Sequence, residues 1–409
     1  LAILSVFVEG WTLEAAVHVS GLPEDRTLDL LDVLSGHSLV HIGVTDAGPR
    51  FRMLASVQEF AAERLADRAD RDEVERRHAE YFGALVENAD WPAEHQGEWA
   101  ERLRVEEENL RVAIRWFLAH DIAPLPHIFR ILWLFWQMRG RMPEGRAWID
   151  ELQLRADTLD DRGQAELLLT SAVTAVEVGD DDSALAAVDG LRRLEGRNDD
   201  DAYLEGAARL AISWILPLVD DFDGALRTAS SVLEDLRRQN DPFMAFAALT
   251  VGMVEMALGR DEEARAHLTE VNELGGQFDN NWLRSTARTQ LAHLAVRSGR
   301  LDEARALLAT SVDSADDTEV STLTLTFALV AAAQLALAEG DGRRAATALG
   351  AADGLRRQGG LRAWPSTRPG EAELVTRVAQ EIAAEDYARA FAAGTELGHR
   401  EAVALVRGP

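Results

Sequence analysis

The sequence contains no cysteine and no lysine, and these absences exclude several kinds of site. A chain without cysteine cannot form a disulfide or a thiolate metal site, which fits the cytoplasmic location that we expect. A chain without lysine cannot form a Schiff base. It also cannot contain a P-loop, because the lysine of that motif must reach the β and γ phosphates of a nucleotide.

Positive charge and long apolar runs are also scarce. The 42 basic residues, all arginine, face 70 acidic residues, and the net charge at pH 7 is −28. Such a chain repels the phosphates of nucleic acids, so we do not expect this region to contact DNA directly. Because no run of about 18 uncharged apolar residues occurs, we expect no membrane span. The sequence opens inside an apolar pattern without methionine, as a fragment of a longer protein would.

Motifs of known chemistry are absent as well. The sequence has neither the His-Glu-x-x-His metal motif nor the Gly-x-Ser-x-Gly nucleophile motif. His37 and His41 are four residues apart but have no third ligand near them in the sequence, so we interpret them as surface or packing residues. The acidic clusters lie at expected helix starts and lack the sixth-position glycine of a calcium loop. We therefore predict no catalytic residue, no metal site and no cofactor bound by this chain, and we do not expect an enzyme.

The strongest pattern is a repeat mark that recurs about every 40 residues. It consists of a residue that ends a helix, acidic residues shortly after it, and an alanine five positions after the helix stop. The mark occurs at Gly179, Asp220, Gly259, Gly299 and Gly340, with a looser copy at Gly140. Successive marks from residue 179 onward are 41, 39, 40 and 41 residues apart, and such a near-constant period is typical of a repeat array.

Each part of the repeat mark has a physical reason. Glycine supplies the left-handed residue that ends one helix, and acidic residues suit the positive N-terminus of the next helix. The alanine lets two antiparallel helices approach closely. Because one hairpin cannot bury its apolar stripe alone, the hairpins must stack, and we predict an α-solenoid of tetratricopeptide-like helical hairpins. The expected helix pairs are 164–178 with 181–194, 202–219 with 222–238, 242–258 with 261–274, 281–297 with 301–312, and 319–338 with 341–357.

Two prolines refine these helix bounds. Pro217 lies late in its helix, which it should kink or shorten. Asp241 precedes Pro242, and this pair predicts a helix that starts with aspartate as its cap and proline in its first turn.

The first 70 residues follow a different pattern, with two helices, a strand pair and a third helix. Residues 13–19 form the first helix, and Thr27 is expected to cap the second. Residues 38–44 and 50–54 read as strands around a turn at 46–49, and residues 57–65 mark the third helix. This is the order of a winged-helix domain. With 5 arginines against 11 acidic residues, we expect it to have a packing and regulatory role rather than to bind DNA.

The predicted fold is therefore mainly α, with a winged-helix domain followed by a helical repeat array. We divide the chain into four parts. They are a winged-helix domain at 1–70, a helical linker with the first hairpins at 71–158, the repeat array at 159–358, and a loop with C-terminal capping helices at 359–409.

Several stretches taken together resemble one family over nearly the whole chain. The stretches are residues 6–16, 38–40, 50–54, 59–65, 107–116, 133–136, 139–146 and 391–403. They resemble the part that follows the nucleotide-binding core in bacterial signal-transduction ATPases of the STAND class, which include LuxR- and SARP-type transcriptional regulators. The resemblance implies a nucleotide switch coupled to a tetratricopeptide-like sensor arm, with ATP or ADP bound in a neighbouring domain.

This sequence departs from the family in two respects. The repeat period is longer than the usual tetratricopeptide period of about 34 residues. Related apoptotic-type ATPases carry a Met-His-Asp motif whose histidine contacts bound ADP, whereas the matching residues here are Met53, Leu54 and Ala55. Leu54 cannot donate that hydrogen bond.

Two groups of residues are candidates for a binding site. Asn281, Trp282, Arg284 and Arg288 open the first helix of a repeat, and first helices usually line the concave face of such arrays. They could hold a peptide or a small acid, or they could serve ordinary packing between repeats. Trp214 is a similar candidate.

The second group belongs to an aromatic segment around residue 136. Trp136 lies among Trp133, Phe135 and Trp148, and these rings could form a core between the small domain and the array. Alternatively they could line a ligand pocket there, with Arg139 or Arg141 as its charged group.

Two functional hypotheses follow. In the first, an inducer or protein partner binds the repeat array, and the winged helix relays this event to a nucleotide-binding core outside the chain. Such a relay needs different affinities for two conformational states. In the second, the chain is a free-standing tetratricopeptide-type scaffold without a nucleotide switch.

Overall fold

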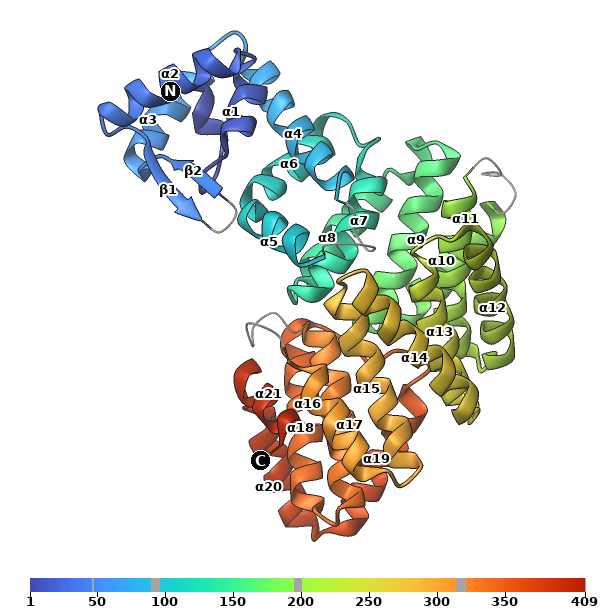
Figure 1. Cartoon of the computed structure of the whole chain (residues 1–409). Helices are drawn as coiled ribbons and strands as arrows, with labels where there is room; N and C mark the ends of the chain where they lie inside the picture. The colour runs from blue at the N-terminus through green and yellow to red at the C-terminus, as the bar shows by residue number, and fades with distance from the viewer. Residues whose placement is uncertain (46–47, 90–95, 195–200, 314–320, 409) are drawn as a thin grey trace. The chain divides into compact units, whose positions relative to one another are not determined.

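The computed structural model describes residues 1–45, 48–89, 96–194, 201–313 and 321–408, and almost all of its regular elements are helices (Figure 1). Residues 46–47 of the expected hairpin turn and residues 319–320 of the last expected pair lie outside the described residues. None of the described helices combines the length and the apolar character that a membrane crossing requires.

The chain divides into two compact units. The boundary falls inside helix α7 (Leu125–Met138), between Ile131 and Leu132. Of the described residues, unit 1 contains those within 1–89 and 97–131, and unit 2 contains residue 96 and the residues after the boundary. The linker expected at residues 71–158 is thus shared between the two units.

Unit 1 starts with the expected winged-helix order. It contains the short helix η1 (Ile3–Val6), α1 (Leu13–Ser20), α2 (Glu24–Gly36), β1 (His41–Thr45), β2 (Gly48–Arg52) and α3 (Ala55–Ala66). The two strands are antiparallel, with Ile42 opposite Phe51. Trp11 exchanges two backbone hydrogen bonds with Phe51, at 3.0 and 2.9 Å, and so continues the sheet.

The cap expected at Thr27 was wrong. Helix α2 begins at Glu24, directly after Pro23, because proline already holds the backbone angle that a helix start requires. Thr27 lies inside the helix, where it is buried and its hydroxyl donates to the carbonyl of Pro23 at 3.1 Å.

The rest of unit 1 is helical. It contains α4 (Arg71–Glu87), α5 (Gln96–Val105), α6 (Glu107–His120) and the first half of α7. The Phe7 ring stacks on Trp11 at 5.3 Å and meets Phe82 of α4 edge-on at 6.3 Å. All three aromatic side chains are fully buried, so they join the N-terminal segment to α4 in one core.

A buried polar network ties the winged helix to α6. Arg50 of β2 pairs with Glu106, and both side chains are almost completely buried. Asn109 donates to Glu106 at 2.7 Å and to the carbonyl of Gly10 at 3.0 Å, and it accepts from the backbone of Val8 at 2.7 Å. Asn109 lies in the stretch 107–116, which carries part of the family resemblance, and its role here is to hold the winged helix against α6.

Unit 2 continues with helices that pair along the chain (Figure 1). Their bounds are α8 (Met142–Gln153), α9 (Asp161–Val178), α10 (Asp181–Leu194), α11 (Ala202–Ile215), α12 (Phe222–Gln239), α13 (Met244–Ala257), α14 (Asp261–Gln277), α15 (Asn281–Arg297), α16 (Leu301–Ser311), α17 (Thr322–Ala338), α18 (Gly342–Gly359), α19 (Arg368–Glu381), α20 (Ala384–Thr395) and α21 (His399–Arg407). The predicted array of helical hairpins is confirmed.

The repeat mark has the structure that its sequence predicts. All six helix stops adopt the left-handed conformation, with φ from 60° at Asp220 to 82° at Gly340. The five alanines that follow are fully buried: Ala184, Ala225, Ala264, Ala304 and Ala345. A methyl group is thus the largest side chain that the close approach of two helices allows at these positions.

The two prolines act at helix ends. Helix α11 stops at Ile215 and continues as the short 3-10 helix η3 (Leu216–Val219), so Pro217 shortens the helix as expected. Asp241 accepts a hydrogen bond from the backbone of Phe243 at 2.8 Å, but α13 begins only at Met244. The expected start at Pro242 was two residues too early, because residues 242 and 243 form a turn.

The first helices of the hairpins are buried on more than one side. In α13 every residue from Ala245 to Glu255 is buried, whereas α12 buries only one stripe of residues three to four positions apart. Polar side chains on these first helices therefore occupy enclosed surroundings.

A leucine at Ala304 should destabilise unit 2 by about 1–3 kcal/mol, because the added atoms would force apart the helices that meet there. Ala306→Leu on the same helix is the matched control, since Ala306 is exposed. Calorimetry should show a lower unfolding temperature for Ala304→Leu and a nearly unchanged one for the control. Equal shifts in both variants would contradict the packing role of the repeat mark.

Candidate binding surface on the repeat array

Two adjacent hollows lie on one face of unit 2, which we name the inner surface. This surface consists of residues from α9, α11, α13, α15, α17 and α19. The segment between α18 and α19 (residues 360–367), which we name the strap, lies against it and borders both hollows. Met253 and Ser366 line both hollows, so the two are contiguous.

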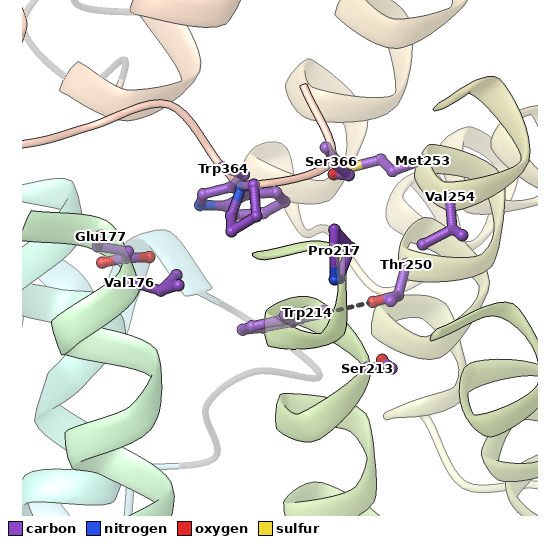
Figure 2. A pocket seen from close by; sticks show the side chains of 11 residues that line it. Val176, Glu177, Ser213, Trp214, Pro217, Thr250, Met253, Val254, Trp364 and Ser366 are labelled. Atoms are coloured by element: carbon purple, nitrogen blue, oxygen red, sulfur yellow. Dashed lines mark hydrogen bonds between the residues drawn. The ribbon is translucent and has the colours of Figure 1, made fainter. Parts of the chain in front are cut away.

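The smaller hollow, which we name the aromatic pocket, is closed by tryptophan rings (Figure 2). Trp364 of the strap stacks on Trp214 of α11, with centroids 5.6 Å apart and 17° between the planes. Trp133 of α7 lies 5.8 Å from Trp214, whose Nε1 donates to Thr250 at 2.6 Å. The space that the rings leave is about 20 Å³, on the scale of one water molecule.

Glu177 of α9 is fully buried beside these rings. Its carboxyl group accepts hydrogen bonds from Gln137 and, at 3.3 Å, from Trp133, and Trp364 also bonds to it. In the described part of the chain no cation pairs with it, and burial raises the pKa of Glu177 to about 8 although these hydrogen bonds lower it. A perturbed acid in a hollow is typical of functional sites.

The strap is held against α9 at both of its ends. The backbone N–H of Arg362 donates to the carbonyl of Glu177 at 2.6 Å. Arg368, the first residue of α19, donates to both carboxylate oxygens of Asp181, at 2.9 and 2.7 Å, and to the carbonyl of Val176 at 3.4 Å. The strap therefore fixes the C-terminal part of the array to its first regular hairpin.

The larger hollow, which we name the inner cavity, has a volume of about 770 Å³. Its apolar lining includes Met253 of α13, Phe327 and Val330 of α17, and Leu374 of α19. A volume of this size suits a small organic ligand or a few residues of a peptide.

Side-chain amides line the same cavity. Gln290 of α15 is 2% exposed, and its Nε2 has no hydrogen-bond partner among the described residues. His293 Nδ1 and Gln334 Oε1 are 2.7 Å apart, and His293 donates this bond because an amide oxygen can only accept. Burial lowers the pKa of His293. Because His293 occupies the Gln334 oxygen, both amides offer N–H donors, which suit carbonyl or carboxylate oxygens of a ligand.

Two of the charged residues that line the inner cavity are held in ion pairs. Arg297 forms an ion pair with Asp261 at 2.7 Å, and Glu371 accepts from Arg356 at 2.7 Å. Arg377 is exposed and has no ion pair within the part of the chain that the structure describes. Arg377 is therefore the cation that a ligand carboxylate could reach without breaking an existing pair.

Among the residues predicted from the sequence, Trp214 lies in the aromatic pocket. Trp282 instead is buried at the start of α15, where its ring stacks on Phe246 of the preceding hairpin at 5.3 Å. Trp282 therefore packs between two repeats, which is the second of the two roles considered for it.

One of the polar candidates near Trp282 connects α15 to its neighbours, and the other two bond to each other within α15. Arg288 donates to Asn272 of α14 and to the carbonyl of Thr310 of α16, both at 3.0 Å, and burial lowers its pKa. Arg284 donates to the exposed Asn281 at 3.4 Å. None of these three residues lines either hollow.

Trp136 packs inside the pair formed by α7 and α8. Its ring lies against Gly145, where a Cβ atom would come within 2.3 Å of it, and the neighbouring Arg139 is exposed. Trp133 from the same aromatic segment instead contacts Trp214, which lines the aromatic pocket. The sequence analysis missed Glu177, Gln290, His293 and Gln334, although polar residues within an otherwise apolar first helix were an available signal.

Comparisons with known proteins define the class of both regions. Residues 1–66 match the family model of the winged helix-turn-helix domain, which confirms the predicted N-terminal domain. A Rap protein solved in complex with competence and sporulation factor aligns with a TM-score of 0.51 at 15% identity, covering 80% of this chain and 95% of that one. This likeness shows the fold of a tetratricopeptide-type helical repeat protein.

Particular relatives come from mycobacteria. Proteins of Mycobacterium tuberculosis and Mycobacterium bovis that are named as HTH-type transcriptional regulators are 30% identical over 182 residues, which is 43% of this chain. The chain spans only about 20% of the length of these curated relatives. A STAND protein with a tetratricopeptide repeat sensor from Pyrococcus horikoshii aligns with a TM-score of 0.48 at 14% identity, covering 91% of this chain and 61% of that one.

Proposed function

We propose that this chain is the regulatory and partner-binding region of a transcriptional regulator, and that an inducer or a peptide binds in its inner cavity. The observation that carries the proposal is the buried, unpartnered Gln290 amide in a cavity of about 770 Å³. A buried donor without a partner costs about 1–3 kcal/mol, and a ligand oxygen would remove that cost.

Two comparisons support this proposal. The winged helix-turn-helix domain and the mycobacterial relatives favour a role in transcriptional regulation. The Rap protein was solved with competence and sporulation factor bound, and a similar use of this fold would give the present chain a protein or peptide partner.

The proposed regulation includes a nucleotide switch outside this chain. An inducer that prefers one arrangement of the array would shift the winged helix and release a neighbouring nucleotide-binding core, where ATP or ADP would bind. The chain itself would be neither an enzyme nor a nucleotide-binding protein, and it would act in the cytoplasm. Leu54 is the residue before α3 and is exposed, and its apolar side chain cannot donate a hydrogen bond to a nucleotide.

The alternative is a scaffold that holds partner proteins without a nucleotide switch. The sequence that precedes Leu1 in the whole protein discriminates between the two. A P-loop there supports the regulator, and a protein without one supports the scaffold.

A thermal-shift screen against metabolites and short peptides tests the inner cavity. Ligands that raise the unfolding temperature of the wild-type chain should bind about fivefold to tenfold more weakly to Gln290→Leu, which lacks the amide donor. This variant should fold, because leucine is similar in size and the substitution removes no observed hydrogen bond of Nε2.

Arg238→Gln on the exposed face of α12 is the control for this screen. It should bind every ligand as the wild type does. The proposal fails if no compound stabilises the wild type, or if Gln290→Leu binds all of them with unchanged affinity.

A further inference from the structure

The strap has the features of a bound peptide. Residues 361–364 form neither helix nor strand, yet Leu361, Ala363 and Trp364 are buried against other segments of unit 2. Extended segments expose their backbone unless another surface receives them. Here that surface is the inner surface of the repeat array, the surface that the proposed function assigns to recognition.

Trp364 is the main anchor of this segment. Its ring stacks on Trp214 (Figure 2), meets Phe327 of α17 edge-on at 5.3 Å, and forms a hydrogen bond to Glu177. Tryptophan in a desolvated pocket is the residue that most often dominates the binding energy of a peptide. The aromatic pocket thus has the form of a tryptophan subsite that the chain itself fills.

Arginine supplies the second anchor, four residues after the tryptophan. Arg368 binds Asp181 through both carboxylate oxygens, next to Asp180 and Asp182 at the start of α10. The first repeat mark is the only one in the described array that is followed by three consecutive aspartates. The acidic start of α10 therefore matches the positive charge of Arg368, which directly follows the strap.

The strap also lies directly over the first repeat mark. A Cβ atom at Gly179 would come within 2.5 Å of the Arg362 side chain, whereas the marks at Gly259, Gly299 and Gly340 have open space at the same position. The first regular hairpin is thus the one that the strap covers. Gly360 ends α18 in the left-handed conformation on one side of the strap, and Pro369 lies in the first turn of α19 on the other.

We propose that the strap is an internal ligand of the inner surface, and that an external peptide with the same chemistry replaces it. That peptide is extended and carries a tryptophan, followed four residues later by an arginine. The inference rests on the proposed function, since it names the class of partner and the element that competes with it. The buried strap then keeps the surface closed until the external peptide is present.

A labelled peptide of sequence Leu-Arg-Ala-Trp-Pro-Ser-Thr-Arg, copied from residues 361–368, tests the proposal by fluorescence anisotropy. The full chain with Trp364→Ala should bind it with a measurable Kd. The wild-type chain should bind it at least tenfold more weakly, because its own strap competes. The same peptide with alanine in place of tryptophan should bind the Trp364→Ala chain at least tenfold more weakly than the original.

A second variant and a second measurement keep the test decisive. If Trp364→Ala does not fold, Arg368→Ala opens the same groove at its other end with less loss of packing. Hydrogen exchange of residues 360–368 in the wild-type chain should also accelerate when the peptide is in excess. A folded variant that does not bind the peptide, or exchange that the peptide leaves unchanged, overturns the proposal.

This outcome is separate from that of the proposed function. Gln290→Leu alters the inner cavity and not the anchors of the strap, so it should not change the affinity of the Trp364→Ala chain for the peptide when the two substitutions are combined. If the strap peptide does not bind, the thermal-shift screen still tests the inner cavity. If no compound in that screen binds, the peptide experiment still tests the strap.

Discussion

Replacing Glu106 by glutamine is expected to destabilise unit 1 by about 3–5 kcal/mol, because the buried Arg50 guanidinium would lose its carboxylate. Arg50 is 3% exposed and Glu106 is 4% exposed, so water cannot take over the lost interaction. Hydrogen exchange followed by mass spectrometry should show the amides of β2 and α6 exchanging about a hundredfold faster or more, since these elements open more often.

Two controls separate this effect from a general loss of charge. Arg50→Met combined with Glu106→Leu removes both charges and should recover most of the protection, because no unpaired charge remains buried. Asp70→Asn breaks the ion pair with Arg68, which is exposed, and should leave exchange unchanged. Wild-type exchange rates in Glu106→Gln would show that the pair does not hold the winged helix to α6.

Glu177→Gln is expected to stabilise unit 2, and more strongly as the pH rises. The folded-state pKa of Glu177 is about 8, against 4.5 as its ordinary value. The folded protein thus holds this proton more tightly than the unfolded chain. The resulting stabilisation is complete below pH 4.5 and is lost progressively as the pH rises toward 8. At pH 7 the loss amounts to about 3 kcal/mol, which a neutral side chain avoids.

Glutamine can be accommodated at this position. Gln137 has a buried Oε1 without a partner among the described residues, so its amide can turn and accept a hydrogen bond from the new NH2 group. Unfolding temperatures measured from pH 5 to pH 9 should diverge between the wild type and Glu177→Gln. The exposed Glu205→Gln on α11 should follow the wild type throughout. A variant less stable than the wild type at every pH would show that the carboxylate is ionised and held by its donors.

The repeat array could be predicted from the sequence almost to its helix ends. The expected helices 181–194 and 281–297 coincide with α10 and α15. The reason is that a repeat mark is local, since a left-handed residue and a small alanine five positions later define both the turn and the close contact. Pro217 likewise acts on its own helix.

The arrangement of the inner surface could be predicted only in part, because it depends on contacts between distant segments. Arg368 and Asp181 are 187 residues apart, and no local pattern relates them. The rotation between successive hairpins decides which side of α15 faces the cavity. Gln290 and His293 lie on that side, whereas Trp282 packs against Phe246 of the preceding hairpin. Trp214 was identified because a large aromatic residue on a first helix is visible in the sequence itself.

The claim that the inner surface recognises a partner is tested most directly by selecting a random peptide library on the wild-type chain. The affinities of the enriched peptides are then measured on Gln290→Leu, on Trp364→Ala and on the outer-surface variant Arg238→Gln. We predict enriched peptides whose affinity changes at least fivefold in one of the inner-surface variants and not in Arg238→Gln. Enriched peptides that bind all four chains equally would contradict the account.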